Sequence, residues 1–217
     1  MENLRSATNI LLTGIEEKIS KYGFLYKKKD KSFKREIDGF TQIFDLIFTK
    51  KREGIYVEPT IRLKSKAIEN IYHLVSKKDP KYFEGTKVLG NNLFKIIKYY
   101  KEGLEVDTNE KQSYLIEEVN DIKILINVIS ENFIDFGIKY FDENSSVSRI
   151  DYLLNNNPRD ISVHNWFYPV RACVAIIAAK LNNNERFTEL KNIYKEEMND
   201  SVAPYKDEFN YLINDIL

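Results

Sequence analysis

The sequence contains few of the residues on which recognisable chemical sites are usually built. Its 217 residues include one cysteine, two histidines and eight glycines. The single cysteine, Cys173, excludes an intramolecular disulfide, and its position in the apolar run 170–177 predicts a buried structural thiol. We therefore expect a cytoplasmic protein, kept in a reducing compartment, whose fold depends on packing alone.

Catalytic and cofactor motifs are missing as well. The sequence has no G-x-S-x-G, no Walker sequence and no G-x-G-x-x-G, and so few glycines leave little chain for a phosphate-binding loop. Neither His73 nor His164 has a Cys, His, Asp or Glu neighbour at metal-ligand spacing. We expect no catalytic residue, metal or cofactor, and the pattern favours a protein that is not an enzyme.

Acidic residues cluster at two places, Glu117-Glu118 with Asp121 and Asp142-Glu143. Paired carboxylates are used as general acids and bases or as ligands of divalent cations. The first group falls at a predicted helix N-terminus, where the helix dipole favours negative charge, and the second falls in a predicted loop. Structural roles are the expectation for both.

Charge is balanced overall, with 33 basic and 33 acidic side chains, but it is uneven along the chain. Up to Lys66 there are 15 basic and 9 acidic residues, an excess of six that the remaining residues cancel. No stretch approaches the roughly 18 apolar residues of a membrane span, and no apolar signal segment follows the first residues. We expect no membrane partner and no export.

Between residues 24 and 64 the apolar residues recur with a period of two, which is typical of strands. The turn signal Asp38-Gly39 and the polar Lys29-Asp30-Lys31 divide this region into hairpins. Pro59 cannot donate a ladder hydrogen bond and so predicts an edge strand or a bulge. The expected strands are 24–28, 32–37, 40–49, 54–64 and a short one at 113–117.

The rest of the chain has the helical period of 3.6 residues. A helix ending at Gly23 precedes the sheet, helices beginning near Ser65 and Leu93 follow it, and Asn120 is the expected N-cap of another. The expected fold class is α+β: an N-terminal helix with a four- or five-stranded antiparallel sheet, residues 1–104, followed by a mostly helical part, residues 105–217, packed with it as one unit. The expected C-terminal helices are 147–154, 166–181, 185–198 and 204–216.

The most suggestive polar feature interleaves cations with aromatic residues between Tyr26 and Arg35. Sheets that bind single-stranded nucleic acid combine such side chains, whereas an acidic protein partner fits the same charges. Alternate residues of a strand point to opposite faces, so the aromatic residues are equally compatible with a core position. The binding residues expected in this region are Lys28, Lys34 and Arg35.

Aromatic residues are abundant, and Trp166, Phe167 and Tyr168 stand together before Pro169. Aromatic residues fill cores and are also enriched at the energetic centres of interfaces. Trp166, together with His164 just before it, completes the set of expected binding residues. A small-molecule site assembled from dispersed Tyr, His and carboxylate side chains is the remaining alternative.

The N-terminal part resembles an uncharacterised family of bacterial domains. The resemblance rests on an opening helix, on Lys21-Tyr22-Gly23-Phe24 leading into residues 31–36, and on the long strand 40–49, and it covers about residues 1–155. Some similar domains are linked to immunity proteins of bacterial toxin systems. The family has no established catalytic residues to transfer, and the helices from Trp166 onward lie outside the resemblance.

Together these observations predict a cytoplasmic protein-binding domain, with an immunity-type inhibitor of a bacterial toxin as the form that the resemblance implies. The expected partner is another protein. A single-stranded nucleic-acid-binding module and a small-molecule-binding domain without a recognisable motif are the alternatives.

Overall fold

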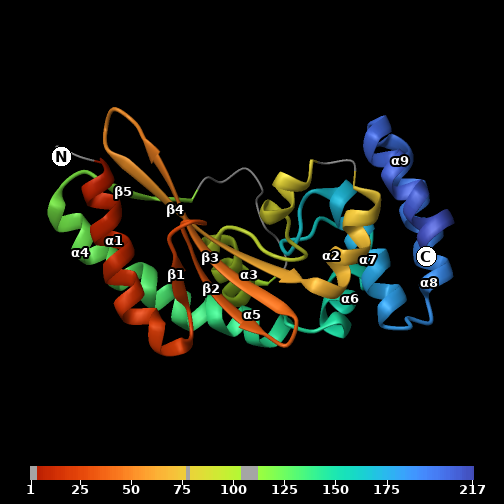
Figure 1. The fold of residues 1–217 in the computed structure, drawn as a ribbon, viewed down its shortest axis with the longest axis horizontal. Coiled ribbons are helices and arrows are strands. Elements are labelled where there is room, and N and C mark those ends of the chain that lie inside the picture. The colour runs from red at the N-terminus through yellow and green to blue at the C-terminus, as the bar shows by residue number, and fades with distance from the viewer. Residues whose placement is uncertain (1–3, 77–78, 104–111) are drawn as a thin grey trace. The chain divides into compact units, whose positions relative to one another are not determined.

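The computed structural model describes residues 4–76, 79–103 and 112–217. These residues form an N-terminal helix, a five-stranded antiparallel sheet and a mostly helical C-terminal half, so the α+β class is confirmed (Figure 1). None of the helices in these ranges is both long and apolar enough to cross a membrane.

The chain divides into two compact units, each made of separated segments. Unit 1 contains residues 1–36, 42–62 and 91–142, and unit 2 contains residues 37–41, 63–90 and 143–217. The expected boundary near residue 104 follows chain order, whereas each unit combines segments from both sides of that boundary.

The described part of the sheet has the order β1-β2-β3-β4-β5, so each strand pairs with its neighbours in sequence. Strand β3 is central, as the sequence predicts. The apolar Ile43 and Ile47 on its second face predict a central strand that is covered on both sides, and this expectation is wrong for its outer half, because Ile47 is 50% exposed. The strands are β1 (Leu25–Lys27), β2 (Ser32–Ile37), β3 (Phe40–Lys50), β4 (Ile55–Ser65) and β5 (Tyr114–Ile116).

The turn between β2 and β3 shows why its two residues were a strong signal. Asp38 and Gly39 both have left-handed backbone angles, with φ of 46° and 81°. Two consecutive residues of this kind form the turn whose twist matches a β-hairpin, and Asp and Gly adopt that conformation at the lowest cost. The hairpin register therefore follows from local sequence.

Pro59 lies in β4, which is not an edge strand because β3 and β5 flank it. The N–H groups of Ile61 and Leu63 donate to Asn91 and Leu89, away from β3, and residue 59 has the same orientation by the period of two. Pro59 lacks an N–H on the side of the strand that faces β5, and the pairing with β5 already ends at Val57. The absence of this donor therefore removes no hydrogen bond to β3.

In unit 1, α1 (Leu4–Ile19) packs against α4 (Val119–Asn132), and α3 (Leu93–Glu102) contacts residues 133–138, which follow α4. Asn120 is not the N-cap of α4, because the helix already begins at Val119. The N-cap is Glu118, and Asp121 completes a capping box with it: the N–H groups of Glu117 and Glu118 both donate to the Asp121 carboxylate at 2.8 Å.

A stack of phenylalanine rings forms the centre of unit 1. Phe44 of β3 lies parallel to Phe133, with ring centroids 4.0 Å apart, and Phe24 meets Phe133 edge to face at 4.9 Å. Phe133 opens a π-helical turn, residues 133–138, which leads into α5 (Lys139–Asn144). A Cβ at Gly137 would lie 2.5 Å from the Phe133 ring, so glycine permits this bend rather than ending the helix.

Unit 2 is built around α7 (Tyr168–Leu181), a helix buried on all sides from Arg171 to Ala179. A helix that is apolar around its whole circumference needs neighbours on every side. Cys173 lies in this stretch and is buried, as expected. Four helices contact α7 directly or through one another: α2 (Lys66–Val75), α6 (Val147–Asn155), α8 (Phe187–Glu197) and α9 (Ala203–Tyr211).

Three asparagine side chains donate hydrogen bonds to a buried carboxylate in unit 2. Asp151 of α6 is 2% exposed and accepts bonds from the side-chain amides of Asn155, Asn182 and Asn184, at 2.6–3.0 Å. The Tyr194 hydroxyl donates to Asn155 Oδ1 and so fixes the orientation of that amide. The junction of α6, α7 and α8 is therefore held by a network in which the buried charge is satisfied.

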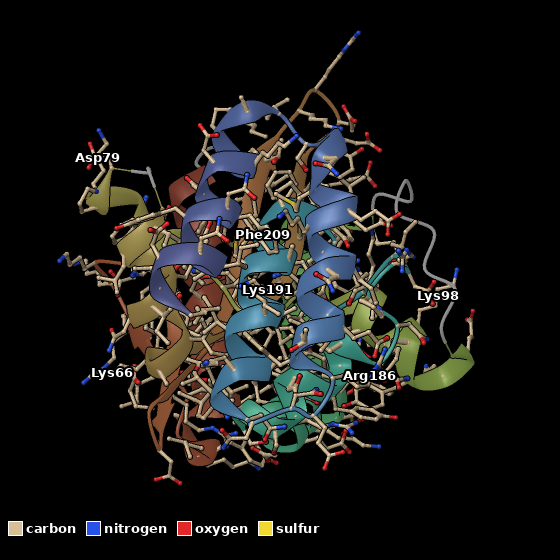
Figure 2. All side chains as sticks on the ribbon, turned by 90° about the vertical axis from the view of Figure 1, so that its right-hand side faces the viewer. Lys66, Asp79, Lys98, Arg186, Lys191 and Phe209 are labelled. Carbon is tan, nitrogen blue, oxygen red and sulfur yellow. The ribbon has the colours of Figure 1, made fainter. Side chains whose placement is uncertain are left out.

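The last two helices are tied to each other at the C-terminal end. Phe209 of α9 is fully buried, and Lys191 Nζ of α8 donates to the C=O of Ile213 at 2.6 Å (Figure 2). Ile213 belongs to the π-helical turn 212–216 that follows α9.

Candidate binding surface around Trp166

The three basic residues that the sequence singles out do not form one surface. Lys34 and Arg35 are consecutive in β2, so their side chains point to opposite faces of the sheet. Lys34 Nζ lies 2.8 Å from Asp30, and Lys28 is exposed in the turn between β1 and β2. The structure therefore separates the residues that the linear pattern groups together.

Arg35 is held inside unit 1 by four neighbours. Its Nε donates to Gln42 Oε1 at 2.5 Å, its Nη1 donates to the C=O of Tyr22, and its Nη2 forms an ion pair with Asp142. The guanidinium lies over the Phe24 ring, 4.7 Å from its centroid. Only 15% of the side chain is exposed, so most of its hydrogen-bonding capacity serves the fold.

His164 and Trp166 lie in the connection between α6 and α7, residues 156–167, which we call the α6–α7 segment. Their environments differ: His164 is 5% exposed, whereas Trp166 is 59% exposed. The expected helix 166–181 begins two residues later, at Tyr168, with Pro169 in its first turn. Trp166 is therefore presented by the segment rather than by the helix.

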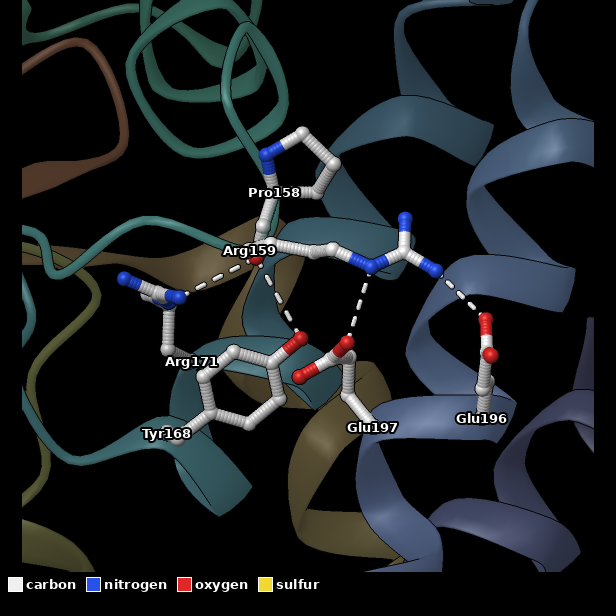
Figure 3. Close-up of polar contacts among 6 residues, drawn as sticks. All are labelled: Pro158, Arg159, Tyr168, Arg171, Glu196 and Glu197. Atoms are coloured by element: carbon white, nitrogen blue, oxygen red, sulfur yellow. Dashed lines mark hydrogen bonds and ion pairs between the residues drawn. The ribbon is translucent and has the colours of Figure 1, made fainter.

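The first half of the segment is fixed by α7. Arg171 donates from Nη1 to the C=O of Asp160 at 2.5 Å and from Nη2 to the C=O of Pro158 at 3.1 Å. The Tyr168 hydroxyl donates to the same Pro158 oxygen at 3.2 Å (Figure 3). A buried guanidinium, 2% exposed, thus holds two backbone carbonyls in place.

Arg159 ties the same stretch to α8. Its Nε lies 2.9 Å from Glu197, and its Nη2 pairs with Glu196, as Figure 3 shows. About half of the Arg159 side chain is exposed, so these ion pairs contribute at most about 1 kcal/mol. These ion pairs orient the first half of the α6–α7 segment more than they stabilise it.

The second half is fixed by residues 88–90. The Gly90 N–H donates to the C=O of His164 at 2.7 Å, and Asn165 Nδ2 donates to the C=O of Val88 at 3.1 Å. Within the segment, the His164 N–H donates to Ser162 Oγ at 3.2 Å. The two residues before Trp166 are buried and bonded, so its backbone has little freedom.

Other apolar side chains lie beside the indole. The Trp166 and Phe167 ring centroids are 5.9 Å apart, and the Phe167 ring meets Tyr205 of α9 at 5.2 Å. We call Trp166, Phe167 and Tyr205 the Trp166 surface.

Two titratable side chains at this site, His164 and Tyr168, are uncharged at neutral pH. Burial, with a smaller effect of the Arg149 guanidinium, lowers the pKa of His164 to about 4. Burial and then the Glu197 carboxylate raise the pKa of the Tyr168 hydroxyl to about 12. His164 is therefore a neutral, buried group two residues before the exposed Trp166.

The carboxylate clusters have structural positions. Asp121 caps α4, and Asp142 lies in α5 rather than in the expected loop, where it pairs with Arg35. Among the residues that the structure describes, no three His, Cys, Asp or Glu side chains are placed to hold a metal ion.

The sequence interpretation missed the residues that fix the segment, above all Arg171. One signal was available, because Arg171 is a charged residue inside the long apolar run of α7. A charge at such a position is kept only where its donors find acceptors. Nothing in the linear pattern identifies those acceptors as backbone carbonyls 11 and 13 residues earlier.

A scan against protein-family models, a search of curated proteins and a search of solved structures each gave no match to this chain.

Proposed function

We propose that this chain is a protein-binding domain that contacts its partner through the Trp166 surface. The proposal depends on one observation: an indole that is 59% exposed stands on a backbone whose neighbouring residues are buried and hydrogen-bonded. Tryptophan is the residue most often found at the energetic centre of protein interfaces.

The fixed backbone favours binding because association must otherwise immobilise the residues that make contact. A fully covered tryptophan buries about 150–250 Å². Covering the exposed share of Trp166, at about 25 cal/mol per Å², contributes about 3 kcal/mol, or about 100-fold in the dissociation constant. The Phe167 ring, with its centroid 5.9 Å from that of the indole, extends the apolar area around it.

Inhibition of a toxin is the form of protein binding that the resemblance of residues 1–155 implies, and we retain it as the proposed role. The Trp166 surface lies outside that resemblance and supports an inhibitor role because its backbone is fixed before contact, which lowers the entropic cost of association. Lys34 and Arg35 support this role less well because both are engaged within unit 1.

The experiment compares three tagged proteins: the wild type, Trp166→Ala and Ile124→Ala. Ile124 of α4 is a matched control because it is 60% exposed and belongs to unit 1. Each protein captures partners from its native host, and the affinity for any stoichiometric partner is then measured by calorimetry. We expect Trp166→Ala to weaken binding about 100-fold and Ile124→Ala to leave it unchanged.

Equal affinity of Trp166→Ala and wild type for the partner would place the contact elsewhere. A preparation that carries nucleic acid and no protein would instead favour the single-stranded nucleic-acid alternative, whose binding weakens steeply with salt. If a partner has an enzymatic or toxic activity, its inhibition by wild type and not by Trp166→Ala would establish the inhibitor role.

A further inference from the structure

The segment that presents Trp166 contains His164. The imidazole of this residue is buried, and its backbone N–H and C=O help to anchor the segment. His164 precedes Trp166 by two residues and is 5% exposed. Its C=O accepts from Gly90 and its N–H donates to Ser162. Any change that expels His164 from its site therefore also breaks bonds that fix the backbone under Trp166.

The charge that acts on the His164 imidazole is that of a cation, Arg149. Arg149 of α6 is close enough for its charge to act on His164, and it is itself held by Asn144 Oδ1 at 3.2 Å and lies over the Tyr152 ring. A protonated His164 would place a second positive charge within the range of the Arg149 charge, away from solvent.

We infer that protonation of His164 opens the α6–α7 segment, so that the Trp166 surface is rigid at neutral pH and released in acid. The opening is a property of the segment alone. Its consequence for partner binding depends on the proposed function.

The direction follows from the difference in proton affinity between the two states. In the closed segment the pKa of His164 is about 4, whereas in an opened, hydrated segment it returns to its ordinary value of about 6.5. The stabilisation of the closed form is complete above pH 6.5 and is lost as the pH falls to about 4. Over that range the equilibrium constant for opening increases by up to about 300-fold.

The only tryptophan in the chain is the reporter this inference needs. Trp166 is excited at a wavelength longer than those that tyrosine absorbs. The decay of its fluorescence anisotropy then measures how freely the Trp166 ring moves. From about pH 7.5 to about pH 4.5 we expect the fast, large-amplitude component to increase in the wild type while far-ultraviolet circular dichroism stays constant. The His164→Gln protein, which cannot be protonated there, should show no such increase.

His73 provides the matched control. It is half-buried in the same unit, with its ring stacked on Phe83 at 3.8 Å, and His73→Gln should behave like the wild type. An increase of equal size in His164→Gln, or a constant decay in the wild type, would overturn the inference.

A second measurement needs no variant and remains decisive if His164→Gln does not fold. The two histidine Cε1–H resonances are followed by NMR through the same pH range. We expect one of them to titrate well below the ordinary histidine pKa and to do so together with the change in Trp166 anisotropy. Titration of both histidines near pH 6.5 would contradict the buried, neutral state on which the inference rests.

Discussion

The β1–β2 hairpin and the α6–α7 segment both carry residues that the sequence marks for binding, yet the fold uses them in opposite ways. In the hairpin, Lys34 and Arg35 turn to carboxylates and become part of unit 1. In the segment, backbone and polar side chains are bonded inward while Trp166 stays exposed. Whether such a residue stays exposed thus depends on whether neighbouring groups offer its side chain a hydrogen bond or an ion pair.

The physical reason is the reach of the side chains. A lysine or arginine has a long flexible stem and can bring its charge to an acidic group several residues or a whole element away. An indole is rigid, and its position is set by the backbone that carries it. When that backbone is held by buried donors and acceptors, as at His164 and Asn165, the ring cannot fold back into the core.

The largest expected effect comes from removing the anchor of the segment. Arg171→Met retains the apolar stem but removes the side-chain donor of the Asp160 carbonyl and leaves the Pro158 carbonyl with the Tyr168 hydroxyl alone. We expect a loss of about 3 kcal/mol in the free energy of unfolding, measured by urea denaturation, together with greater mobility of Trp166.

Arg159→Met is the matched control, because it removes an arginine of the same stretch that is about half exposed. Its expected cost is below about 1 kcal/mol. If Arg171→Met were as stable as Arg159→Met, the segment would not depend on the buried guanidinium, and the contrast with the hairpin would lose its physical basis.

The strands could be predicted well because their signals are local. The bounds 32–37 are those of β2, and the Asp38-Gly39 turn adopts the expected conformation. Pro59 misled because the pattern does not show which side of a strand each N–H faces or where the neighbouring strand ends. Asn120 misled for a similar reason, since Asp121 supplies the cap from inside the helix.

The candidate site was less predictable because its contacts join distant residues. Trp166 was identified by residue type, but its exposure depends on Val88 and Gly90, more than 70 residues earlier. Arg35 was assigned to a binding patch because the local pattern does not show its partner Asp142, which is 107 residues away in sequence. Periodicity places a side chain on a face and does not reveal what covers that face.

A smaller effect is expected from releasing the cation of the hairpin. Arg35→Met loses the bonds to Gln42 and Tyr22 and the ion pair with Asp142, while its stem still covers Phe24. We expect a cost of about 2 kcal/mol in urea denaturation, less than that of Arg171→Met because the site is nearer to solvent.

Asp142→Asn separates the two components of that cost. The Asp142 side chain is 55% exposed, so losing the ion pair alone should cost less than about 1 kcal/mol. Equal losses for Asp142→Asn and Arg35→Met would mean that the exposed ion pair, and not the bond to Gln42, holds the arginine in place.

The smallest effect is expected at Lys28, the residue of the basic group that the hairpin leaves exposed in its turn. Lys28→Glu should change the free energy of unfolding by less than about 0.5 kcal/mol, as surface substitutions usually do. Against an identified partner it should alter the association rate and its dependence on salt, because a charge at the rim steers the encounter without being desolvated. Trp166→Ala should instead increase the dissociation rate. A larger loss of affinity in Lys28→Glu than in Trp166→Ala at physiological salt would transfer the contact from the aromatic segment to the basic hairpin.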